Sequence, residues 1–136
     1  MYEKLRDNWH RLTHAEKKYL AQHPIHAAVI EKNALTALEE AKHRFGAGSL
    51  HNGDGDAFRH CYWSALMSRD LGYDNAKTFV SAHENFTGNP VREKEMDMHN
   101  NHEGLILGAT WPRKNLELAT LCYEYLLKGK LRRKLR

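Results

Sequence analysis

The spacing of apolar residues constrains this chain more than any other feature of its sequence. Between residues 25 and 45 they recur three and four positions apart, as in Ile25, Ala28, Val29, Leu35 and Leu38. That interval is one turn of an α-helix, and no window shows the strict alternation of a half-buried strand. The 136 residues are enough for one domain with its own core. We therefore expect an all-α fold, a single compact bundle of about five to six helices over residues 1–136.

Capping and helix-breaking residues divide this pattern into elements. Thr13 and Glu16 have the spacing of a capping box, which predicts a first helix ending near Gln22. A second helix should have Pro24 in its first turn and Gly46 at its end. The pattern predicts four further helices, over residues 56–70 closed by Gly72, 74–86 capped by Asp74 or Asn75, 92–107, and from Pro112 onward.

Glycine predicts the main loop and one close contact. Residues 46–55 contain four glycines, too many for a stable helix or a central strand, so we expect a loop there. Gly104 and Gly108, by contrast, fall in or beside the fifth predicted helix. There they would allow another helix to approach closely.

Positive charge is concentrated at the C-terminal end. Residues 128–136 form a basic tail with six Lys or Arg and no acidic residue. Subtracting these six from the net charge of +4 leaves −2 on the other 127 residues, so the body is not basic. The basic tail could hold nucleic acid or an anionic membrane surface through its phosphates. It could equally be a solvated helix end that complements the helix dipole.

The N-terminal residues and the two cysteines indicate where the protein is made and which cysteine chemistry is excluded. The N-terminal residues lack the apolar stretch of a signal peptide, so we expect synthesis in the cytoplasm, with secretion or delivery into a target cell left open. Cys61 and Cys122 have no CxxC or CxxH spacing. This argues against a disulfide framework or a thiolate zinc site and favours two buried apolar cysteines.

Asp56 and His60 provide the first candidate site. Four residues apart on a helix, they share a face with Trp63, Ser64 and Met67, whereas Phe58, Tyr62, Ala65 and Leu66 share an apolar one. A carboxylate beside an imidazole can orient it, raise its basicity or bind a metal with it. The alternative is a helix-capping aspartate and an unrelated core histidine.

Two later segments add candidates. His83 and Glu84 follow Phe79 on a side expected to be buried, where an imidazole needs a polar partner. Residues 96–104 then place Asp97 and Asn101 on one stripe with Asn100 beside them, although Asn lowers helix stability. Carboxylate and amide oxygens suit calcium, magnesium or manganese, and an added imidazole shifts the preference toward zinc, manganese or iron. A structural role for each segment remains the alternative.

Together these segments predict a site for one divalent metal ion, whether zinc, calcium, magnesium or manganese. The expected ligands are Asp56, His60, His83, Glu84 and Asp97. The expected supporting residues are His51, Asn100, Asn101 and Trp63.

The order of these motifs resembles a known kind of domain. His51-Asn52, Asp56-Ala57-Phe58-Arg59-His60 with Trp63, Ala82-His83-Glu84, and Met96-Asp97 with Asn100-Asn101 and Gly104 resemble a small helical domain at the C-termini of bacterial polymorphic toxins, including Rhs-type and type VI secretion effectors. The resemblance covers about residues 46–108. It implies an antibacterial effector neutralised by a cognate immunity protein, with family positions at His51, Asp56, Arg59, His60, His83, Glu84, Asp97 and Asn101.

Our leading hypothesis is metal-assisted hydrolysis of a phosphate-containing substrate, either lipid-linked or nucleic acid. The expected catalytic residues are His60, Glu84, Asp97 and Arg59. Glu84 or His60 would be the general base, and Arg59 would neutralise a phosphate-like transition state. One alternative is hydrolysis of a cell-wall glycan by a carboxylate pair such as Glu84 and Asp97, which would make the cell envelope the substrate. A second is a non-enzymatic helical binding module.

Overall fold

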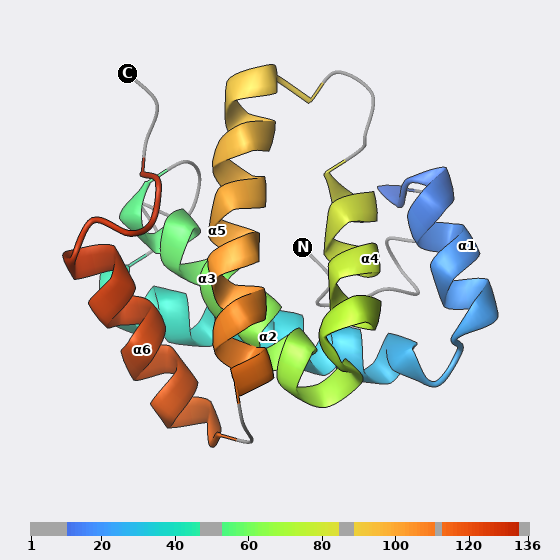
Figure 1. The fold of residues 1–136 in the computed structure, drawn as a ribbon, viewed down its shortest axis with the longest axis horizontal. Helices are drawn as coiled ribbons and strands as arrows, with labels where there is room; N and C mark the ends of the chain where they lie inside the picture. The colour runs from blue at the N-terminus through green and yellow to red at the C-terminus, as the bar shows by residue number, and fades with distance from the viewer. Residues whose placement is uncertain (1–10, 47–52, 85–88, 111–112, 134–136) are drawn as a thin grey trace.

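A computed structural model describes residues 11–46, 53–84, 89–110 and 113–133, which form six α-helices and no strand (Figure 1). The expected all-α fold is confirmed. The helices are α1 (His14–Gln22), α2 (His26–Phe45), α3 (Asp54–Leu71), α4 (Tyr73–His83), α5 (Val91–Thr110) and α6 (Asn115–Leu127). Across these residues, no helix combines the length and apolar character needed to cross a membrane.

Most predicted helix ends agree with the structure. Thr13 caps α1 in a complete capping box with Glu16. Gly46 and Gly72 follow α2 and α3 with φ of 72° and 89°, a left-handed conformation that suits glycine. The predicted cap of α4 is wrong: the helix begins at Tyr73, directly after Gly72, and the side chain of Asn75 donates to the Leu71 carbonyl oxygen instead.

Other boundaries differ from their predicted positions. Helix α3 begins at Asp54, inside the predicted loop, where Asp54 and Asp56 place negative charge in the first turn. Helix α5 runs to Thr110 and contains both Gly104 and Gly108. The last helix begins only at Asn115. Pro112 and loop residues 47–52, including His51, lie outside the described residues.

Helix α3 is the centre of the fold. It packs against α2, α4, α5 and α6, and Phe58, Trp63 and Leu66 on it are fully buried. The side of α3 that carries Asp56 and His60 is buried as well, at 3% and 5% exposure. The predicted polar and apolar faces of this helix are therefore both interior. Polar side chains on α3 must find their partners inside the protein.

Gly104 and Gly108 bring α5 against α3, as the sequence predicted. A Cβ at residue 104 would overlap the carbonyl oxygen of Cys61, and one at residue 108 that of Ala65. This contact places the Asp97 to Asn101 stretch of α5 beside the first two turns of α3. On another side of α3, buried Cys61 lies with its Sγ 3.2 Å from that of Cys122 on α6, and both thiols are free.

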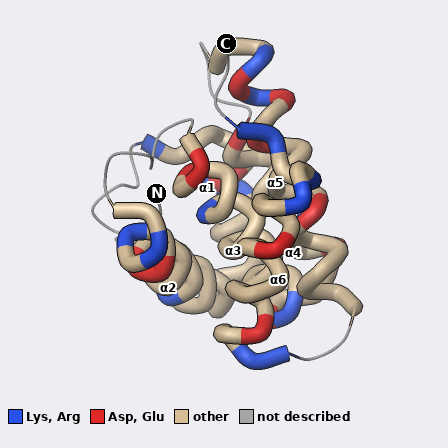
Figure 2. Tube along the Cα trace, turned by 90° about the vertical axis from the view of Figure 1, so that its left-hand side faces the viewer, with Lys and Arg blue, Asp and Glu red and all other residues tan. Residues whose placement is uncertain are grey.

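The described part of the basic tail, residues 128–133, folds back onto α5. Asn100 donates to the Arg132 carbonyl oxygen and accepts from the Arg132 amide, both at 2.8 Å. Leu131 is buried, and Arg133 approaches Asp54 at the start of α3 to 3.5 Å. Figure 2 shows basic and acidic positions interspersed along the trace rather than gathered on one side. This part of the tail therefore helps to hold the fold together.

Candidate metal centre

Asp56 and His60 meet on the first two turns of α3. His60 Nε2 lies 3.4 Å from Asp56 Oδ1, as their spacing of four residues predicted. Asp97, from α5, approaches the same nitrogen with its Oδ1 at 3.5 Å. Among the described residues, these three form a group whose ligand atoms all lie within 4.8 Å of one another. We call Asp56, His60 and Asp97 the triad.

Asn101 fixes the orientation of the His60 ring. Its Oδ1 lies 3.2 Å from His60 Nδ1 and accepts a hydrogen bond from Ser64 Oγ at 3.1 Å. Because Nδ1 is held in this way, Nε2 is the nitrogen that faces the two carboxylates. Histidines that bind metals usually have the second ring nitrogen held by such a partner. This role explains why Asn101 occurs within α5, where asparagine lowers helix stability. The neighbouring Asn100 binds the chain at Arg132 rather than the triad.

Two buried carboxylate oxygens at or near the triad have no hydrogen-bond partner within the described parts of the chain. They are Asp97 Oδ1 and Glu84 Oε2. Glu84 directly follows α4 as its C-cap residue and is 1% exposed. A buried carboxylate oxygen without a hydrogen bond is costly, because that oxygen has lost its hydration. A bound cation would remove that cost.

The charges of the acidic groups dominate the electrostatics of the triad. Burial by itself lowers the pKa of His60, but Asp56, Asp97 and Glu84 outweigh it and raise that pKa to about 9. The pKa of Asp97 is raised to about 6, chiefly by burial and further by the charges of Glu84 and Asp56, while His60 and His83 oppose the shift. In the metal-free protein the imidazolium therefore supplies the positive charge that these carboxylates require.

His83 and Glu84, two of the predicted ligands, lie outside the triad. His83 Nδ1 is 3.2 Å from Glu16 Oε2, and His83 Nε2 is 4.0 Å from Glu84 Oε2. The carboxylate of Glu16 is fully buried, and its other oxygen accepts from the Thr13 amide at 2.7 Å. The capping box of α1 therefore also holds His83. Nothing in the sequence indicates this second role, because the capping box already accounts for Glu16.

The remaining candidates occupy different positions. Arg59 donates to Asp56 Oδ1 at 3.1 Å, so its guanidinium borders the triad. Trp63 is fully buried and packs edge-on against His83, with ring centroids 6.0 Å apart. It supports the site through packing. His51 lies outside the described residues.

Comparison with known protein families assigns most of the chain to one domain family. Residues 17–130 match a family described as a domain of unknown function, DUF6973. The chain belongs to this family. The matched range contains every member of the triad together with Glu84, Asn101 and Arg59. No solved structure matches the chain significantly.

The two ligand separations at His60 Nε2 in the DUF6973 triad are close to those around a tetrahedral metal ion. Ligand atoms about 2.1 Å from a tetrahedral ion lie roughly 3.4 Å from one another, close to the 3.4 and 3.5 Å separations at His60 Nε2. One imidazole with two carboxylates favours zinc or manganese over calcium or magnesium. Three protein ligands leave at least one position for water or substrate, as in catalytic rather than structural zinc sites. The triad could therefore hold one divalent ion.

We expect the metal-free DUF6973 domain to lose stability as the pH rises. His60 has a folded pKa of about 9 against 6.5 ordinarily, so the stability from its charge is complete below 6.5 and lost toward 9. Asp97 has a folded pKa of about 6 against 3.8, so its ionisation begins to destabilise the fold between those values. Both effects act in the same direction, so the stability of the metal-free domain should fall as the pH rises.

Thermal unfolding in EDTA from pH 5 to 9 checks this expectation. Saturating zinc or manganese should flatten the decline, because a metal ion replaces the proton on His60. A midpoint that stays level or rises with pH in EDTA would contradict the assigned charges.

Proposed function

We propose that this DUF6973 domain is a metal-dependent hydrolase that cleaves a phosphate ester. The observation that carries the proposal is the buried triad, with two carboxylates 3.4 and 3.5 Å from one imidazole nitrogen. In this proposal Asp56, His60 and Asp97 hold a single divalent ion. The ion supplies Lewis acidity toward a phosphoryl oxygen and lowers the pKa of a water molecule.

Glu84 is the proposed general base. Its carboxylate is buried near enough to the triad to raise the pKa values of both His60 and Asp97 by its charge. One of its oxygens has no hydrogen-bond partner in the described structure, so it is able to accept a proton from water. The Glu16–His83 pair beside it would restrain this carboxylate. Thus Glu84 acts on the nucleophile in our proposal, while the triad holds the ion.

Arg59 is the proposed phosphate-binding residue. Its side chain is 17% exposed and lies against Asp56, so its guanidinium borders the metal centre without being sealed in the core. A planar guanidinium can donate two parallel hydrogen bonds to phosphate oxygens, which lysine cannot do. Charge that develops on a transferring phosphoryl group would be neutralised there.

We further propose that the domain acts as an antibacterial effector delivered into a competitor. This proposal is supported by the resemblance of the domain's motifs to those of polymorphic toxin domains. The same resemblance implies that a cognate immunity protein is its partner. Because Asn100 and Leu131 fix the described part of the basic tail to the fold, we assign substrate binding to the metal centre and Arg59. The substrate is then a lipid-linked phosphate or a nucleic acid.

Hydrolysis of bis(p-nitrophenyl) phosphate by the purified domain tests this function. We expect turnover with zinc or manganese, loss of turnover in EDTA, and recovery on adding the ion back. Arg59→Lys should lower the rate by about tenfold or more while leaving metal affinity nearly unchanged, because lysine lacks the bidentate fork. Turnover that is indifferent to EDTA would rule out the metal mechanism.

One observation favours a second candidate, hydrolysis of a cell-wall glycan. The raised pKa of Asp97, about 6, is appropriate for a general acid, and Glu84 is a second buried carboxyl group near it. This mechanism needs no ion. Release of soluble fragments from peptidoglycan in EDTA would favour it over the phosphate ester reaction.

A further inference from the structure

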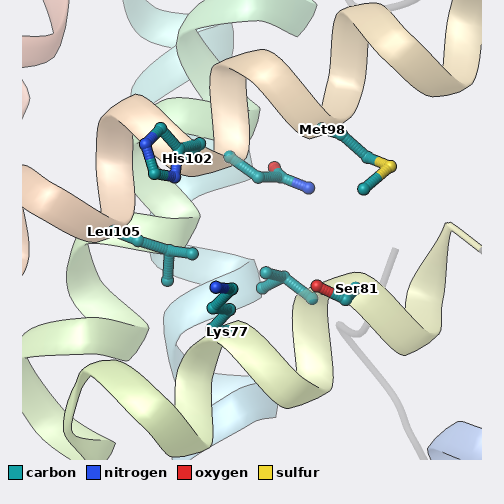
Figure 3. Close-up of a pocket in the computed structure, with 7 residues that line it drawn as sticks. Lys77, Ser81, Met98, His102 and Leu105 are labelled. Carbon is teal, nitrogen blue, oxygen red and sulfur yellow. The ribbon is translucent and has the colours of Figure 1, made fainter.

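A small pocket between α4 and α5 lies beside the metal centre and is not used by the proposed reaction. Its volume is about 80 Å³, room for a few water molecules or a group of a few heavy atoms, since a water occupies ~30 Å³ in the liquid. Figure 3 shows Lys77 and Ser81 entering it from α4, with Met98, His102 and Leu105 facing them from α5.

Asn101 lines this pocket with an unused hydrogen-bond donor. The residue is 2% exposed, and its Nδ2 has no hydrogen-bond partner within the described structure. Its Oδ1 faces two donors, the hydroxyl of Ser64 and Nδ1 of His60 when that ring is protonated. With the amide in this orientation, Nδ2 is directed away from Ser64 and His60. A buried amide donor of this kind requires an acceptor.

The other polar groups of the pocket also suit an acceptor. Lys77 contributes a positive charge, and its Nζ lies 5.9 Å from the centre of the Tyr73 ring one turn earlier. Ser81 offers a hydroxyl and His102 an imidazole, and no carboxylate is among the lining residues described. The remaining wall is apolar, with Val80 and Leu105 each 2% exposed. A cation would find no counter-charge here, whereas an anion would find an amide, an ammonium, a hydroxyl and an imidazole as donors.

We propose that this pocket binds a small oxyanion, a phosphate or carboxylate group. One oxygen of the anion accepts from Asn101 Nδ2, and its charge is balanced by Lys77. An apolar portion attached to the anion contacts Val80, Met98 and Leu105. This binding does not depend on hydrolysis. It does connect with the metal centre, because Asn101 bonds to His60 through the opposite end of the same amide.

Titration of the EDTA-treated domain with inorganic phosphate, acetate and propionate tests this inference, with chloride holding the ionic strength constant. Side-chain amide resonances of Asn101 report binding by nuclear magnetic resonance. We expect saturable shifts with at least one anion, and propionate tighter than acetate if the carboxylate is the group bound. Lys77→Gln should weaken binding by about tenfold and Ser81→Ala by severalfold, because charge-assisted hydrogen bonds are the stronger ones.

Two matched control variants distinguish anion binding in the pocket from the general effect of removing a charge or a hydroxyl group. Lys18→Gln on α1 removes an exposed lysine elsewhere, and Thr78→Ala removes an α4 hydroxyl that bonds only its own helix at the Asp74 carbonyl. Both should leave the affinity unchanged. Shifts that do not saturate, or an affinity insensitive to Lys77→Gln and Ser81→Ala, would overturn the proposal. Since no metal is present, that failure would leave the hydrolase proposal standing on its own test.

Discussion

Asp97→Asn should reduce divalent metal affinity and phosphate ester hydrolysis by at least about 100-fold, more than the roughly 10- to 100-fold typical of losing a residue that only supports a ligand. The substitution keeps the size of the side chain but removes the charge. In the metal-free protein it also removes repulsion from Asp56 and Glu84, which helps to raise the pKa of Asp97. We therefore expect the unfolding midpoint in EDTA to stay the same or rise at pH 7.5.

This pairing of lost function with unchanged or higher stability distinguishes a binding site from a structural network. A residue kept for folding would lose stability when replaced. The matched control is Asp74→Asn, an exposed aspartate in the first turn of α4, which should leave metal affinity unchanged and lower stability by no more than about 1 kcal/mol. If the domain arrests growth when produced in a bacterium, Asp97→Asn should abolish that arrest. A variant that keeps full metal affinity, or unfolds in EDTA well below the wild type, would count against the assigned role.

Gly104→Ala should destabilise the domain by about 2 to 4 kcal/mol, because overpacking of a tight interior carries a cost of this order. The added methyl group would overlap the backbone carbonyl of Cys61, which cannot rotate away as a side chain can. In an exposed helix the same change would stabilise by up to ~1 kcal/mol. The sign of the effect therefore reports the contact between α3 and α5.

Chemical denaturation in EDTA measures this effect, and metal titration adds a second readout. Because the contact positions Asp97 and Asn101, moving α5 outward should also weaken metal binding. Gly108→Ala should behave similarly through its overlap with Ala65, whereas Ala109→Gly on the exposed side should lose only about 1 kcal/mol. A Gly104→Ala protein as stable as the wild type would show that the two helices are farther apart than described.

Features that depend on local spacing could be predicted from the sequence. The capping box at Thr13, the glycine ends of α2 and α3, and the meeting of Asp56 with His60 all follow from residues within one turn of each other. The approach of Asp97 to His60 follows only from the expectation that polar residues on separate helices face the same interior site. Gly104 and Gly108 explain why α5 lies close enough to α3 for this to occur.

Features that depend on distant packing could not be predicted in this way. Glu16 reaches His83 across 67 positions, and Asn100 holds Arg132 across 32. Nothing in either residue's neighbourhood indicates its partner. The asparagine pair did carry one usable signal, because its poor helix propensity required compensation. The structure divides that compensation between Asn101 at the triad and Asn100 at the returning chain.

In our proposal, Asp56, His60 and Asp97 bind one divalent ion. Diffraction from crystals grown with zinc, recorded on both sides of the zinc absorption edge, tests it most directly. We predict one dominant anomalous peak per chain, about 2.0 to 2.3 Å from His60 Nε2 and from one oxygen of each aspartate. A peak elsewhere, or none at the triad while His60 Nε2 still faces the two carboxylates, would show that these residues do not bind the ion.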